Sequence, residues 1–259
     1  MPQTVEHLDI LGLLGVKSGL VVITKTDLAD DEWLRMLEED IKARVWGTFL
    51  EGKPVLRTSA RTGEGIEALR EALHELALHT AEKLKDTTRH CYTSGGRHES
   101  VAEHSWRIAL MAFFLRDEFP EADMDKVTRM CLIHDLGECF TGDIPAFDKT
   151  AQDESTEEAL LYQWVASLPS PCREEMRALC DEMAALETQE AQIYKALDKL
   201  EAVISHNESD ISTWEDHEYD LQLTYGEQNV AFSPYLTALR QAVRQESLDK
   251  IAREGDRRK

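Results

Sequence analysis

The sequence predicts an α-rich, mixed fold in which a small α/β parallel-sheet half-domain over residues 1–80 precedes an all-α domain over residues 81–259. Two observations lead to this expectation. Short apolar runs rich in β-branched residues occur only in the first segment, and apolar residues recur at helical spacing through the second. With 42% hydrophobic residues, the 259-residue chain can build one large or two modest domains.

The first 80 residues alternate between helical and strand patterns. Asp30 or Asp31 can cap the second helix, and Gly63 and Gly65 lie in a turn before the third. The order α-β-α-β-α is typical of a parallel sheet with crossover helices. The predicted elements are helices over 5–14, 31–45 and 66–78 and strands over 19–24 and 54–59.

From residue 81 onward, strand signals nearly vanish. Val101, His104 and Ile108 share one face of the first helix at i+3/i+4 spacing, and Asp123 can cap the second. The predicted helices cover 100–119, 123–140, 154–167, 172–186, 189–206 and a last segment after Pro234, with a loop over 141–153 and a mostly basic tail over 253–259.

The chain carries 50 acidic and 29 basic residues, a formal net charge of −21. We therefore expect no polymeric nucleic-acid partner and no anionic membrane partner, since both need a basic face. The longest apolar run, 108–115, is shorter than the roughly 18 residues of a membrane span. With no signal-peptide pattern and no C-x-x-C pair among the five cysteines, a cytoplasmic protein with reduced thiols is expected.

Three predicted helices each present a histidine or an aspartate on an apolar face. His104 lies on one, His134 and Asp135 end the next, and Asp198 interrupts a third. A lone histidine on such a face is usually a core residue, but a buried unpaired carboxylate is strongly unfavourable. A shared divalent cation explains the set most simply. Two imidazoles and two carboxylates favour Mn, Co, Fe, Zn or Ni over Ca.

Two stretches narrow this interpretation: residues 97–105 read RHESVAEHS, and residues 134–145 read HDLGECFTGDIP. They resemble the 5'-deoxynucleotidase branch of the HD-domain metal-dependent phosphohydrolases, and the resemblance runs from about residue 89 to about residue 230. It implies an all-α HD domain over 81–259 and a homodimer. It also implies one divalent metal ion, since no second histidine pair of the dinuclear relatives is present, with the ligands His104, His134, Asp135 and Asp198.

The same resemblance implies roles for further residues. Glu138 and Asp143 match the residues that position the attacking water and relay protons, and Arg89 and Arg97 can fork onto phosphate oxygens. His90 follows Arg89 where the family pattern often has an aromatic residue, which leaves the sugar or base contact open.

The expected activity is hydrolysis of (deoxy)ribonucleoside 5'-monophosphates, small nucleotide substrates, to nucleoside and phosphate. Three alternatives stay open: an HD-type phosphodiesterase, a nucleotide triphosphohydrolase, and a guanine-nucleotide or partner-binding module with a vestigial enzyme. The acidic residues between 208 and 220 lack EF-hand spacing and predict a solvated face, with His206 and His217 at the surface.

Short polar motifs follow both predicted strands of the first segment, TKTD at 24–27 and SAR at 59–61. Ligands of α/β sheets bind at this end of the strands, and an aspartate there can accept hydrogen bonds from a guanine edge. Residues 2–79 resemble the GTPase domain of the selenocysteine-specific elongation factor, which implies the C-terminal half of a P-loop GTPase fold. Because the chain has no G-x-x-x-x-G-K-[ST] loop, we expect a truncated remnant. Its vestigial guanine-binding residues would be Lys25, Asp27, Ser59 and Ala60.

Overall fold

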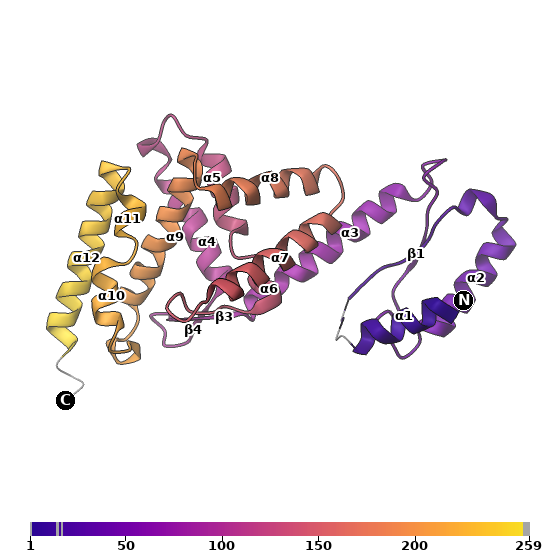
Figure 1. Ribbon diagram of the computed structural model, residues 1–259, viewed down its shortest axis with the longest axis horizontal. Coiled ribbons are helices and arrows are strands. Elements are labelled where there is room, and N and C mark those ends of the chain that lie inside the picture. Colours follow the sequence, from indigo (N-terminus) through magenta and orange to yellow (C-terminus); the bar gives the residue numbers. More distant parts are fainter. Residues whose placement is uncertain (1, 14–15, 17, 256–259) are drawn as a thin grey trace. The chain divides into compact units, whose positions relative to one another are not determined.

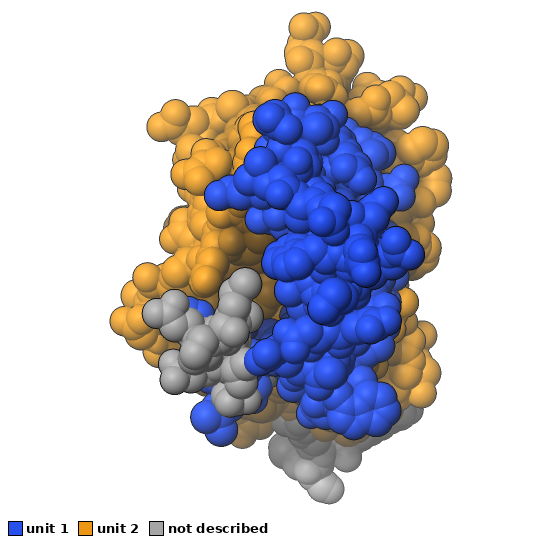
Figure 2. Space-filling model, turned by 90° about the vertical axis from the view of Figure 1, so that its right-hand side faces the viewer, with its two compact units in different colours: residues 1–80 blue, residues 81–259 orange. Residues whose placement is uncertain are grey.

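The computed structural model describes residues 2–13, 16 and 18–255. The chain divides into two compact units, residues 1–80 and residues 81–259, which Figure 2 distinguishes by colour. Each unit has its own secondary structure and is described separately.

The first unit contains the predicted two-stranded parallel sheet. Strand β1 (Val21–Ile23) pairs with β2 (Val55–Arg57), and Val22 lies opposite Leu56. Asp30 caps the second helix by accepting a hydrogen bond from the backbone N–H of Trp33 at 2.8 Å. The predicted α-β-α-β-α order is confirmed, although Leu14 lies outside the described residues. The helices are α1 (Pro2–Leu13), α2 (Asp31–Val45) and α3 (Ile66–Ala81).

Three helices form the centre of the second unit: α4 (Val101–Phe114), α5 (Met124–Ile133) and α9 (Gln189–Glu208) pack against one another (Figure 1). Their facing side chains are fully buried, among them Ile108, Val127, Met130, Ile193 and Leu197. The other helices are α6 (Glu138–Thr141), α7 (Ala151–Ser167), α8 (Cys172–Ala185), α10 (Glu218–Thr224), α11 (Glu227–Val230) and α12 (Pro234–Glu254). Among the described residues, no helix combines the length and hydropathy needed to cross a bilayer.

The predicted helix over 123–140 is wrong in one respect, because it breaks between α5 and α6. The N–H of Leu136 donates a hydrogen bond to the carbonyl of Ile133. This spacing of three residues, typical of a 3₁₀ turn, tightens the chain at this point. Gly137 lies against α7, where an added Cβ would approach Glu157 Cγ to 2.6 Å. The apolar pattern continues through the break, so periodicity could not reveal it. Helix α7 also starts earlier than predicted, since Thr150 and Asp153 form a capping box.

A short antiparallel β-hairpin precedes the helical core, and the sequence pattern did not indicate it. Strand β3 (Thr88–Tyr92) pairs with β4 (His98–Ser100), and Gly96 adopts a φ of 81° in the turn. The hairpin packs against α9 and therefore brings the side chains of β3 to the middle of the unit. Ser100 then caps α4 through a capping box with Glu103.

Candidate active site

Four polar side chains from the three central helices converge at one point. His104 lies on α4, His134 and Asp135 directly follow α5, and Asp198 lies on α9. His134 Nε2 is 2.9 Å from Asp135 Oδ2, and His104 Nε2 is 3.4 Å from Asp198 Oδ1. Both crossed pairs, His104 Nε2 to Asp135 Oδ2 and His134 Nε2 to Asp198 Oδ1, are 3.9 Å apart. The structure thus brings together all four residues that the sequence predicted as metal ligands.

The donor atoms of this cluster fit a divalent cation. The Nε2 atoms of His104 and His134 are buried and make no hydrogen bond to any residue that the structure describes. His134 Nδ1 lies 2.9 Å from the carbonyl of Cys131 and His104 Nδ1 contacts Glu201, so in each ring the Nδ1–H can donate and Nε2 keeps its lone pair. With bonds of about 2.1 Å, neighbouring ligand atoms of an octahedral ion lie about 3.0 Å apart and opposite ones about 4.2 Å apart. The four measured distances fall in or close to this range.

The two carboxylate oxygens of Asp198 have different partners: one faces the cluster and the other faces two lysines. Its Oδ2 lies 3.0 Å from Lys195 Nζ and 3.2 Å from Lys199 Nζ, while its Oδ1 faces the histidines. Burial opposes ionisation of this carboxyl, but the two ammonium groups hold its pKa well below the usual range. Asp198 is therefore a fixed negative charge that one cation can share.

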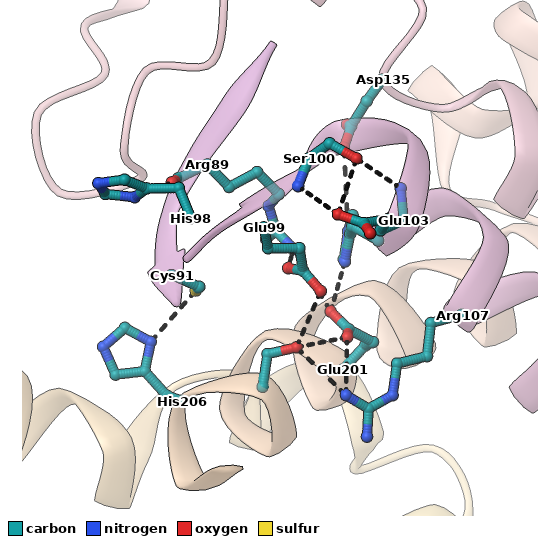
Figure 3. A network of polar contacts seen from close by, with 12 residues as sticks. Arg89, Cys91, His98, Glu99, Ser100, Glu103, Arg107, Asp135, Glu201 and His206 are labelled. Carbon is teal, nitrogen blue, oxygen red and sulfur yellow. Dashed lines mark hydrogen bonds and ion pairs between the residues drawn. The ribbon is translucent and has the colours of Figure 1, made fainter. Parts of the chain in front are cut away.

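Glu201, three residues after Asp198 on α9, is a functional residue that the sequence reasoning missed. It is completely buried, and its carboxylate accepts hydrogen bonds from His104 Nδ1, from Ser205 Oγ at 2.6 Å and from Arg89 Nη1 at 3.4 Å (Figure 3). Burial opposes its ionisation, yet its hydrogen bond from His104 lowers its pKa to about 2. Its spacing of three residues from Asp198 places both side chains on one helix face. This was the only indication in the sequence that Glu201 belongs to the site.

A cavity of about 250 Å³ opens beside the cluster, and Asp135 and Asp198 line it together with Glu138 and Asp143. Glu138 is 5% exposed, and its Oε2 has no hydrogen-bond partner within the described part of the chain. Burial, followed by the nearby charge of Asp135, raises the pKa of Glu138 to about 10. Burial also raises the pKa of Asp143, but the positive charge of Arg89 opposes that shift. Both carboxyls therefore hold a proton more readily than an ordinary carboxyl does.

Arg89 and Arg97, both predicted to bind phosphate, lie in different surroundings. Arg89 lines the cavity, and Glu99 Oε2 holds its Nη1 at 3.0 Å. The side chain of Arg97 is 63% exposed, pairs with Glu103 and is not part of the cavity wall. Lys149 lines the cavity instead. The structure thus brings one of the two predicted arginines to the site.

The four predicted guanine-binding residues lie beside the ends of the strands in the first unit. Asp27 Oδ1 accepts a hydrogen bond from Ser59 Oγ at 2.5 Å, and Asp27 Oδ2 lies 2.7 Å from Arg61 Nε. Lys25 has a φ of 58°, and Ala60 is exposed. Both oxygens of Asp27 are therefore engaged within the chain.

The HD domain family model matches residues 81–240. 5'-deoxynucleotidase HDDC2 from Homo sapiens is 33% identical over 119 residues, which cover 45% of this chain and 57% of that protein. The crystal structure of a predicted metal-dependent phosphohydrolase from Magnetospirillum magnetotacticum MS-1 is similar, with 31% sequence identity and a TM-score of 0.60. This match covers 70% of this chain and 96% of that chain.

The first unit has relatives of a different kind. The elongation factor Tu GTP binding domain model matches residues 1–79. A selenocysteine-specific elongation factor from Desulfomicrobium baculatum is 47% identical over 77 residues, which cover 30% of this chain and 12% of that protein. The chain thus spans a small part of this relative and little more than half of the HDDC2 protein.

Proposed function

The chain belongs to the HD domain family, and we propose that it is a metal-dependent phosphomonoesterase that hydrolyses (deoxy)ribonucleoside 5'-monophosphates to nucleoside and phosphate. One observation supports this proposal most directly. Among the described residues, the buried Nε2 atoms of His104 and His134 have no hydrogen-bond partner, and they face two carboxylates at the wall of a cavity of about 250 Å³. The name of the HDDC2 relative agrees with the proposed substrate class.

His104, His134, Asp135 and Asp198 would hold the divalent cation, as their donor set and spacing allow. When bound, such a cation neutralises phosphate charge and makes a water molecule more acidic. Glu201 orients the His104 ring toward the cluster through Nδ1, and the Cys131 carbonyl does the same for His134.

Glu138 and Asp143 would divide the proton transfers. Glu138 holds its proton because burial raises its pKa, so it can donate to the leaving 5'-oxygen of the nucleoside. Asp143 lines the same cavity; burial raises its pKa and the positive charge of Arg89 opposes that shift, so in its carboxylate form it can take the proton of the attacking water. One carboxyl that donates a proton and a second that accepts one, both at the wall of the same cavity, is the arrangement that acid–base hydrolysis needs.

Arg89 would bind the phosphate of the substrate. Glu99 and Glu201 both contact its Nη1 and so fix the plane of the guanidinium group at the cavity wall. A guanidinium group held in one orientation can donate two parallel hydrogen bonds to the oxygens of a phosphate. Lys149 would supply a second positive charge, whereas Arg97 would need to move to reach the cavity.

The experiment is a phosphate-release assay on a panel of nucleoside 5'-monophosphates with Mn²⁺ or Co²⁺. Wild-type protein is compared with Asp135→Ala and with the exposed control Asp117→Ala. We expect activity in the wild type and the control, and its loss after chelation or in Asp135→Ala. Activity that survives both chelation and that substitution would refute the proposal.

Adding cyclic nucleotides and nucleoside triphosphates to the panel separates the alternative reactions by their products. A phosphodiesterase converts a cyclic nucleotide to a ring-opened monoester, and a triphosphohydrolase releases tripolyphosphate from a nucleoside triphosphate. Orthophosphate from a monophosphate identifies the proposed reaction.

A further inference from the structure

A second set of imidazoles and one carboxylate lines the same cavity. His90 follows Arg89 on β3, His206 lies in the last turn of α9, and Glu218 is the first residue of α10. Glu218 Oε1 is 2.8 Å from His206 Nε2 and 3.1 Å from His90 Nε2. The sequence placed His206 and Glu218 at the surface, which is wrong, since they are only 7% and 2% exposed.

Hydrogen bonding within the chain leaves part of this set unexplained. His90 Nε2 is buried and makes no hydrogen bond with residues 2–13, 16 or 18–255, although Glu218 Oε1 lies close to it. A buried polar atom without a partner is uncommon and costs stability. Glu218 Oε2 accepts a hydrogen bond from the backbone N–H of Glu215 at 2.6 Å, which fixes the carboxylate with Oε1 toward the imidazoles.

The neighbours of His206 fix the orientation of its imidazole ring relative to Glu218. Cys91 Sγ lies 3.2 Å from His206 Nδ1, and burial raises the pKa of this thiol to about 12, so it stays uncharged. If Nδ1–H donates to the sulfur, Nε2 carries the lone pair that faces Glu218. The indole of the fully buried Trp214 donates to the His206 carbonyl at 3.1 Å and holds the end of the helix in place.

We propose that His90, His206 and Glu218 bind a second divalent cation in the cavity. Two imidazoles and one carboxylate are ligands that Zn²⁺, Mn²⁺ and Fe²⁺ accept, and three protein ligands leave positions open. The distances of 2.8 and 3.1 Å match the spacing of about 3.0 Å between neighbouring ligand atoms around an octahedral ion. All three ligating atoms lie within 4.8 Å of one another.

The second cation goes beyond the proposed function, for which the sequence predicted a single ion. It explains why the carboxylate of Glu218, whose ion pairs are with His90 and His206, is buried between these two imidazoles. Its open positions would face the cavity, where an oxygen of the bound substrate could complete the coordination.

The test counts metal ions on the full-length protein. Protein stripped with a chelator is dialysed against Mn²⁺ or Co²⁺ at low concentration, and bound metal is measured by inductively coupled plasma mass spectrometry. We expect two equivalents on the wild type. We expect one on His90→Ala, His206→Ala and Glu218→Gln, and one on Asp135→Ala, which retains the new site. The matched control His217→Ala, which changes a nearby histidine outside the cavity wall, should keep two.

A single equivalent on the wild type would overturn the proposal, even if a variant fails to fold. Two equivalents that persist in His90→Ala and His206→Ala would overturn it as well. The visible absorption of bound Co²⁺ provides a second readout, since Asp135→Ala should retain the band that His206→Ala loses. Phosphate release is measured separately, so failure of the catalytic proposal does not decide the metal count.

Discussion

Replacing Glu201 with glutamine tests the idea that this buried carboxylate sets the metal affinity. The substitution keeps the shape of the side chain but removes the charge that accepts the hydrogen bond of His104 Nδ1. A hydrogen bond to a charged group contributes about 1.5–3 kcal/mol. At about 1.4 kcal/mol for each factor of ten, this corresponds to a loss of about 10- to 100-fold in metal affinity. Substitutions of residues that orient metal ligands give losses of about the same size.

The assay is a titration of the chelator-stripped protein with Mn²⁺, followed both by metal binding and by phosphate release. Glu201→Gln should need more metal for half-maximal activity and should recover most of its rate at saturation. The matched control is Glu208→Gln, which lies on the same helix, pairs with Arg107 and is half exposed. Metal affinity of Glu201→Gln within about twofold of the wild type would refute the reasoning, because its predicted loss is at least tenfold.

The remaining predictions concern phosphate binding, protonation and salt. Arg89→Ala should raise KM and lower kcat/KM for a nucleoside monophosphate by at least about tenfold. Arg97→Ala should change them by less than about threefold, because Arg97 is exposed and outside the cavity; equal losses in steady-state kinetics would contradict this assignment. The metal-free protein should lose stability as pH rises from about 5 toward 10, since native Glu138 keeps a proton that the unfolded chain releases above its ordinary pKa of 4.5. Urea unfolding should show a shallower pH slope in Glu138→Gln, and an unchanged slope would show that another group is responsible. The wild-type kcat/KM should rise modestly with added salt because the net charge of −21 repels an anionic substrate, whereas a steep fall between low and moderate salt would exclude this explanation.

The helices of the second unit were predictable because burial imposes a period on apolar residues. That period placed His104 and Asp198 on inward faces, and the structure brings both to one point. The break after α5 was not predictable, because it follows from the close approach of Gly137 to α7. The spacing of apolar residues along the sequence contains no information about contacts between distant segments. The hairpin was missed for a related reason: its five- and three-residue strands are too short for a clear alternation.

The roles of charged residues were harder to predict than their presence. Sequence spacing shows that Glu201 shares a face with Asp198, but it cannot show that the side chain is completely buried. Glu218 lies within a run of acidic residues that resembles a solvated surface, yet it is buried against His206. Arg97 belongs to a motif that also supplies His104, but the hairpin turns its side chain to solvent. In each case the deciding fact is a contact between segments far apart in the sequence.

The net charge of −21 and an anionic substrate are compatible if the cavity differs from the rest of the surface. Without a cation, Asp135 is a carboxylate at the cavity wall and would repel a phosphate, while Lys195 and Lys199 already neutralise Asp198. A bound cation reverses the local sign and attracts the phosphate to the side that Arg89 occupies. Metal and phosphate must then strengthen each other's binding by the same factor, because coupling between two ligands is reciprocal. Under the proposed function, the cation would let a strongly acidic protein select a small anion, and we expect its outer charge to disfavour long nucleic acids.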